Sequence, residues 1–258
     1  DVLAPELARM TTGLRGRLAF FGIAGVLSVY ILYDKEVLKR QMKRLYRAYM
    51  PEKIYTIPVN EAFDASAEDA SNGCPFCSLY NMLEENELET ILGASMMEPD
   101  IRQRTNAEGF CATHYHMMFE RKNRLGLALI LESHLEEVRK GQAGSLLSTL
   151  RAPGADAEKK LSALESSCYV CSRIGQAFEK MLDCSVYLWE TEKAFREKTA
   201  AQPYFCLIHY RKFMEAGRKR MGKKVFQSFF DAISATEKAA LDQLQEDVSW
   251  FCKKFDYR

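Results

Sequence analysis

A four-residue metal-ligand pattern occurs twice in this chain of 258 residues and constrains its fold more than any other feature. The first copy comprises Cys74-Pro-Phe-Cys77 and Cys111-Ala-Thr-His114, and the second comprises Cys168-Tyr-Val-Cys171 and Cys206-Leu-Ile-His209. The gap between the halves is 33 residues in the first copy and 34 in the second. Because C-x2-C and C-x2-H pairs supply the thiolate and imidazole ligands that zinc prefers, we predict that the chain binds two zinc ions.

The sequence around the second half of each pattern is also repeated. IRQRTNAEGFCATHY (101–115) matches FREKTAAQPYFCLIHY (195–210) with one inserted residue. The copies are offset by 94 residues at the first cysteine and by 95 at the histidine. A repeat of this kind indicates two copies of one supersecondary unit. We therefore predict an N-terminal extension (1–49), a first repeat (50–150) and a second repeat (151–258).

The hydrophobic pattern predicts a mostly α fold. Apolar residues from Leu79 to Leu92 recur at three- and four-residue steps, and 125–138 and 225–255 also read as helices. We expect a short extended segment at 54–59, limited by Pro58, and a polar loop over 63–73. The glycine-rich stretch 141–156 is the expected linker between the repeats.

Four protein ligands close a zinc shell, so each quartet predicts a structural site and not a catalytic one. The C-x2-C of one repeat can join the C-x2-H of the same repeat or of the other, and duplication favours the same repeat. His114 is preferred to His116 as the first histidine ligand, because only His114 has a histidine, His209, at the matching position of the second repeat.

Several other residues carry weaker predictions. Arg102 and Arg196 occupy matching positions and are candidates for offsetting the negative charge of the metal–thiolate groups. His134 has no counterpart in the repeat, and we expect it on a helix surface. Cys184 and Cys252 lie outside the quartets in apolar surroundings and are expected to be buried core thiols.

Two other chemistries remain open. Cys74-Pro-Phe-Cys77 looks like a dithiol redox site, although the expected βαβ context is missing. Three cysteines and a histidine can also hold an iron–sulfur cluster. Covalent haem is disfavoured, because serine and not histidine follows both C-x2-C pairs. We find no glycine-rich phosphate loop or nucleophile elbow, and we expect an interaction or regulatory protein more than an enzyme.

Location and partners are only weakly indicated. The net charge of +1 gives the whole chain no attraction to nucleic acid or lipid, although the basic segments 121–124 and 218–224 are local candidates for nucleic-acid contact. The apolar run 18–33 would span about 24 Å as a helix and is a candidate membrane anchor or core helix. Downstream Lys and Arg residues place the remainder in the cytoplasm, where thiols stay reduced.

From Met50 onward the chain resembles an uncharacterised family of bacterial cytoplasmic proteins known only as a domain of unknown function. The resemblance rests on IYTIPVNEAF, the GCPFC pair, TNAEGFCATHY, NRLGLAL and the second CxxC with its YFCLIHY. It covers about four-fifths of the chain and excludes the first 49 residues. It implies a cytoplasmic location and assigns no activity, so an unknown protein partner is the main expectation.

Overall fold

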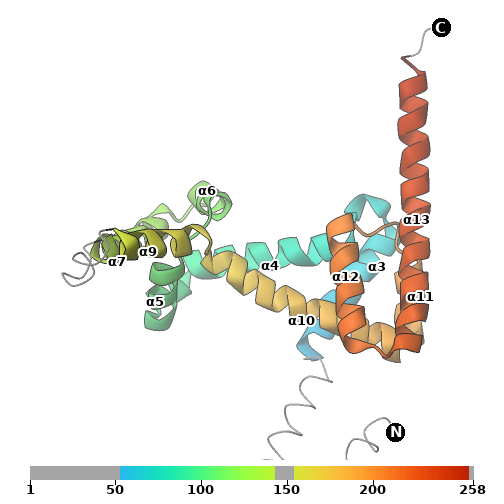
Figure 1. Cartoon of the computed structure of the whole chain (residues 1–258), viewed down its shortest axis with the longest axis horizontal. Coiled ribbons are helices and arrows are strands. Elements are labelled where there is room, and N and C mark those ends of the chain that lie inside the picture. The colour runs from blue at the N-terminus through green and yellow to red at the C-terminus, as the bar shows by residue number, and fades with distance from the viewer. Residues whose placement is uncertain (1–52, 143–153, 256–258) are drawn as a thin grey trace, which may run out of the picture. The chain divides into compact units, whose positions relative to one another are not determined.

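The computed structural model describes residues 53–142 and 154–255 (Figure 1). These residues form ten α-helices and short 3-10 turns, and they contain no strand, which confirms the mostly α prediction. The apolar run 18–33 lies outside the described residues, as does most of the expected linker. No helix among the described residues is both long and apolar enough to cross a membrane.

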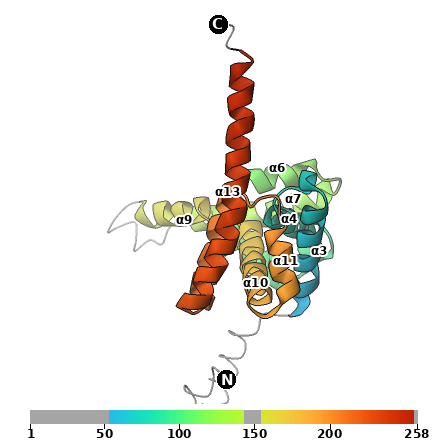
Figure 2. The same cartoon turned by 90° about the vertical axis from the view of Figure 1, so that its right-hand side faces the viewer.

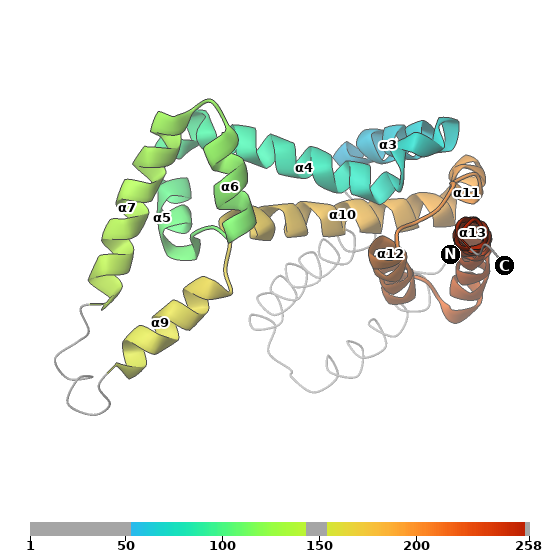
Figure 3. The same ribbon diagram turned by 90° about the horizontal axis from the view of Figure 1, so that it is seen from above.

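Two long helices run side by side in opposite directions at the centre of the fold (Figure 3). They are α4 (Pro75–Leu92) and α10 (Tyr169–Thr191), and each directly follows the first cysteine of a C-x2-C pair. Because the two helices are antiparallel, their N-terminal ends lie at opposite ends of the pair. The two C-x2-C pairs are therefore separated along the helix axes.

Each long helix is followed by three helices in the same order. In the first repeat these are α5 (Pro99–Glu108), α6 (Ala112–Glu120) and α7 (Arg124–Gln142). In the second they are α11 (Lys193–Ala200), α12 (Leu207–Arg220) and α13 (Lys223–Lys253). The long helices are preceded by α3 (Thr56–Glu68) and α9 (Ala155–Glu165). The matching order supports the duplication read from the sequence.

The start of the described region differs from our prediction. Residues 53–55 form a 3-10 turn, and 56–68 form α3, so neither the extended segment nor the first half of the expected loop is present. Pro58 is the third residue of α3, where its missing N–H leaves no helical hydrogen bond unmade. Val59 and Phe63, one turn apart, are fully buried and fix α3 against the core.

The buried side chains form two hydrophobic clusters, and each contains residues from both repeats. The first cluster surrounds the start of α4 and includes Phe63 and Phe76 together with Phe178 and Phe213. The second surrounds the start of α10 and combines side chains of α4, α6, α7 and α10 with one from the segment before α6: Leu88, Ile91, Phe110, Met118, Ile130, Tyr169, Val170 and Ile174. Neither repeat forms a core from its own residues alone.

The contact between α12 and α13 depends on a close helix approach at Gly217. A Cβ added at this position would overlap the ring of the buried Phe229. We expect Gly217→Ala to lower the free energy of unfolding by about 1–3 kcal/mol, because the core cannot accommodate the methyl group without moving the ring.

The matched control is Gly175→Ala in α10, where an added Cβ meets nothing within 4 Å. This change should stabilise the helix by about 0.5–1 kcal/mol. Urea unfolding of both variants under identical metal conditions measures the difference. Equal stability of the two variants would contradict the close approach.

Candidate metal centres

The eight predicted ligands occupy one recurrent position in four helices. Cys74, Cys111, Cys168 and Cys206 are the N-cap residues of α4, α6, α10 and α12. The second ligand of each pair is therefore the third residue of the helix. N-cap and N3 side chains face each other across the first turn, as in a capping box. The free N–H groups and the positive end of the helix dipole at this turn favour thiolates.

The structure brings these pairs together between the repeats. Cys74, Cys77, Cys206 and His209 form one group, which we call site A. Cys111, His114, Cys168 and Cys171 form the other, which we call site B. The expectation that each quartet closes within its own repeat is therefore wrong. Helix α4 explains why: its 18 residues carry the chain about 27 Å away from Cys74 before the C-x2-H pair is reached.

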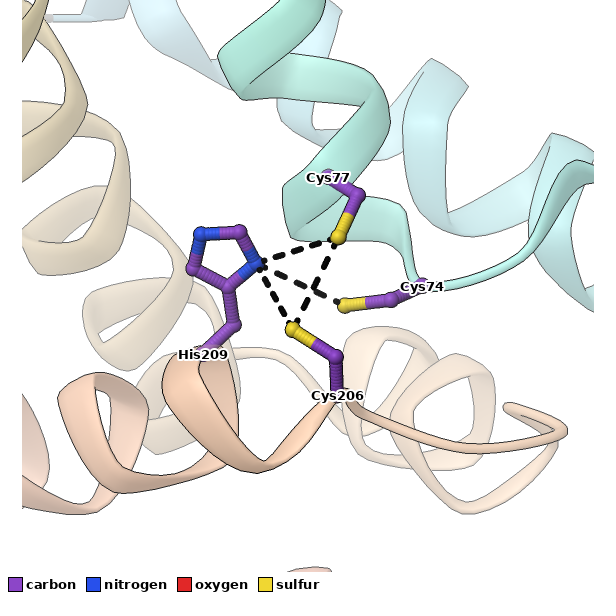
Figure 4. Close-up of side chains that lie close together, drawn as sticks. All are labelled: Cys74, Cys77, Cys206 and His209. Atoms are coloured by element: carbon purple, nitrogen blue, oxygen red, sulfur yellow. Dashed lines mark hydrogen bonds between the residues drawn. The ribbon is translucent and has the colours of Figure 1, made fainter.

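The ligand atoms of site A lie at distances that suit one metal ion (Figure 4). His209 Nδ1 is 3.2 Å from Cys206 Sγ, 3.4 Å from Cys77 Sγ and 3.9 Å from Cys74 Sγ. The two sulfurs of Cys77 and Cys206 are 3.6 Å apart. Tetrahedral zinc with ordinary bond lengths places its ligand atoms about 3.5–3.8 Å apart. The four side chains thus outline the edges of a single-ion tetrahedron.

Site B has the same geometry. His114 Nδ1 lies 3.2 Å from Cys111 Sγ, 3.3 Å from Cys168 Sγ and 3.4 Å from Cys171 Sγ. The backbone N–H of Cys171 donates to Cys168 Sγ, so the helix start contributes directly to holding the sulfur. The nearby backbone N–H of Tyr169 donates to the carbonyl of Gly109, which ties the two repeats together beside the ligands.

The two sites differ behind their histidines. At site B, Nε2 of His114 lies 3.1 Å from Glu84 Oε1, a carboxylate on α4. The position of Glu84 in the second repeat is taken by Phe178 on α10, whose ring centre is 5.0 Å from that of His209. Phe76 and Tyr80 also pack near His209. One histidine is therefore held by a carboxylate, and the other by aromatic rings.

The surroundings of site A keep its groups neutral in the metal-free protein. Burial, with the charge of Lys212, lowers the pKa of His209 to about 4. Burial also raises the pKa of Cys74, and burial with the neighbouring thiols raises the pKa of Cys77 to about 12. His209 is ready to bind a metal as neutral imidazole, whereas the thiols must release protons when a metal enters.

Site B holds a proton between its ligands. The hydrogen bond to Cys168 raises the pKa of His114 to about 9, against burial and with help from Glu84. Burial acts to raise the pKa of Cys168, but hydrogen bonds from His114 and the Cys171 backbone outweigh it and lower that pKa to about 6. A metal ion at this site would replace the proton on Nδ1, while Nε2 stays directed at Glu84.

The remaining sequence predictions have mixed outcomes. Arg196 donates to the carbonyls of Trp189 and Glu190, and no contact from Arg102 or Arg196 to a ligand sulfur occurs among the described residues. His134 is buried, with Nδ1 2.9 Å from the Asn106 carbonyl, so the surface prediction was wrong. Cys184 is buried as expected, whereas Cys252 is exposed. Glu84 was missed, because nothing in its local sequence marks it.

Several residues of the basic segments 121–124 and 218–224 contact other side chains of the protein. Arg121 forms an ion pair with Glu85, and Lys219 is paired with Glu215. The guanidinium of Arg124 lies over the ring of Phe119. These contacts account for part of the positive charge in 121–124 and 218–224. Nucleic-acid contact through them stays a prediction.

A family model described as "Family of unknown function (DUF6062)" matches residues 50–258. The chain belongs to this family. The match begins at Met50, the position from which the resemblance was read, and it includes all eight ligands of sites A and B. Searches of curated proteins and of solved structures found no match. The function must therefore be argued from the sites themselves.

Removal of the Glu84 carboxylate should weaken metal binding at site B alone. A carboxylate that accepts from a ligating imidazole fixes its orientation and raises its basicity, and its loss typically costs about 10–100-fold in metal affinity. We expect Glu84→Gln to lower the affinity of one of two bound ions by this factor. Competition with a chromophoric chelator measures both affinities.

The control for this variant is Glu85→Gln on the same helix. Glu85 is half-exposed and contacts Arg121, not a ligand, so this change should leave both metal affinities unaltered. An equal effect of the two variants, or a loss of both ions in Glu84→Gln, would contradict the specific role of Glu84.

Proposed function

We propose that this protein is a non-catalytic zinc-binding protein in which two structural Cys3His sites hold a helical interaction module together. The observation that carries the proposal is the convergence of three sulfurs and one imidazole nitrogen within 4.8 Å at each site. Four protein ligands complete the zinc shell and leave no open position for a substrate.

The donor spacing favours a single ion over an iron–sulfur cluster. A cluster divides its protein ligands between two or more irons with inorganic sulfide between them, and so needs a wider ligand set than one ion. All four donor atoms of each site lie within 4.8 Å of one another, which suits one ion better than a ligand set shared between irons. Zinc is the metal that the mixed sulfur and nitrogen donor set suits best.

A structural role follows from what each site joins. Site A ties the start of α4 to the start of α12, and site B ties the start of α10 to that of α6. Zinc at both sites would cross-link the repeats at two separated places along the central helix pair. The proposal places the chain in the cytoplasm, where free thiols persist, and gives it a protein partner.

Paired cysteine variants test both the metal content and the crossed connection. Cys77→Ser with Cys206→Ser removes two ligands from site A, and we expect one zinc ion per chain to remain. Cys77→Ser with Cys111→Ser removes one ligand from each site, and we expect weakened binding at both. Elemental analysis of protein purified without added metal measures the stoichiometry.

These two variants would give different zinc contents if each site were formed within one repeat. In that arrangement the Cys77/Cys111 variant would retain one intact site and the Cys77/Cys206 variant would have none. A wild-type chain without zinc, or one with iron and sulfide, would reject the zinc proposal itself.

A thiol-based sensor is the second candidate, and the exposure of Cys171 favours it. Each site has two buried ligands, but Cys171 of site B is exposed, whereas the two accessible cysteines of site A, Cys77 and Cys206, are half-buried. Hydrogen peroxide would oxidise two thiolates of site B to a disulfide, with two protons taken up, two waters formed and the zinc ion released.

We therefore expect peroxide to release one zinc ion per chain well before the second. A zinc-sensitive dye follows the release, and mass spectrometry of alkylated peptides identifies the oxidised cysteines. Disulfides should appear first among Cys111, Cys168 and Cys171. Simultaneous release from both sites, or resistance of both, would count against a sensor and leave the structural role.

A further inference from the structure

The C-terminal end of α13 extends away from the rest of the described helices (Figures 1 and 2). The buried residues of α13 are Phe229, Ile233 and Glu237, one turn apart. Glu237 ends this face, and its carboxylate accepts a hydrogen bond from the backbone N–H of Phe205. Every residue from 241 to 255 is exposed. The helix thus continues for several turns after its own core contacts end.

The exposed part of α13 and the turn that directly follows it carry an apolar stripe with coiled-coil spacing. Its members are separated by three, four, three and four residues, and their exposed fractions run from 44% to 64%: Leu241, Leu244, Val248, Phe251 and Phe255. This spacing defines the a and d positions of two heptads. Of the ten other residues in 241–255, eight are polar or charged, and Trp250, which is 60% exposed, lies off the stripe at a c position. The stripe is therefore a narrow seam of the kind that pairs with another helix.

The distribution of charged residues along the same segment indicates that the partner is a second copy of the chain. The acids Asp242, Glu246 and Asp247 come first, and Lys253 and Lys254 follow. Asp247 and Lys254 are seven residues apart and share the g position, beside the seam. In an antiparallel helix pair g faces g, so Asp247 of one chain would face Lys254 of a second copy, and the same contact would form again by symmetry.

We propose that the exposed end of α13 pairs with the same segment of a second copy of the chain in antiparallel orientation. The register that aligns Asp247 with Lys254 of the second copy also brings the apolar residues of the two seams opposite each other. Leu244 then packs opposite Phe255 of the second copy, and Val248 opposite Phe251. In a parallel pair g would face e, and Asp247 would meet Cys252 without any charge complement.

A membrane surface fits this segment less well. Interfacial helices have a broad apolar face and a polar face rich in Lys and Arg. Here the seam is one residue wide, and the acids beside it would be repelled by anionic lipid. The paired segment is only two heptads long, which places the contact among small, reversible interfaces. The proposal does not depend on the metal at sites A and B.

Sedimentation velocity of the full-length, zinc-loaded chain over a dilution series tests the proposal. We expect a reversible monomer–dimer equilibrium. Val248→Asp with Phe251→Asp should weaken dimerisation by at least roughly a hundredfold, because four carboxylates would be placed in the seam. The matched control is Ala239→Asp with Ser249→Asp, which adds the same charge at exposed positions away from the seam and should still dimerise.

Charge exchange tests the antiparallel orientation. Asp247→Lys alone and Lys254→Asp alone should each weaken the dimer by roughly tenfold, because two attractive contacts become repulsive. The chain that carries both changes restores opposite charges at g and should recover the wild-type affinity. Asp247 and Lys254 are both exposed, so circular dichroism and thermal unfolding of these variants should match the wild type.

The contrary outcomes are equally distinct. A monomer at every concentration overturns the proposal, as does an oligomer that the seam variant leaves unchanged. Failure of the double charge exchange to restore affinity overturns the antiparallel arrangement. Cosedimentation of a monomeric chain with vesicles of phosphatidylcholine and phosphatidylglycerol, lost in the seam variant, would assign the stripe to a membrane instead.

Discussion

The meeting of two helix starts at each ligand group is the constraint on which the rest of this structure depends. In every C-x2-C or C-x2-H pair, the first residue is the N-cap and the second is N3 of a helix. The geometry of the first helical turn therefore holds the two side chains of a pair close together. Two pairs converge only if two helices start at the same place. The antiparallel packing of α4 and α10 meets this condition twice, once at each end.

Duplication supplied two equivalent sites, and their surroundings then became different. The single exchange of Glu84 for Phe178 at matching positions gives one histidine a carboxylate partner and the other an aromatic enclosure. The exposure of the ligands also differs, since Cys171 at site B is exposed while its counterpart Cys77 at site A is half-buried. Two sites with identical ligands are thereby given different access to solvent and different electrostatics.

The sequence was sufficient to predict the helical class and to identify the cysteines and histidines that converge in the structure, because helical periodicity and residue spacing are local properties. It was not sufficient for the pairing, which depends on the direction in which α4 and α10 pack. The length of α4 could have indicated the crossed pairing, because most of this 18-residue helix lies between Cys77 and Cys111. Glu84 and the burial of His134 depend on contacts 28–30 residues away in sequence, and no local pattern reports such contacts.

The crossed connection also sets the order in which the sites are completed during synthesis. Cys111 and Cys171 of site B are 60 residues apart, and this segment lies wholly inside the 135 residues from Cys74 to His209 of site A. The residues of site B therefore all lie, along the sequence, between the first and second pairs of site A. On the ribosome, all four residues of site B emerge before Cys206 and His209, which lie at the start of α12 and complete site A. Cys74 and Cys77 therefore wait longest for their partner residues, and both thiols must stay reduced until the start of α12 has emerged.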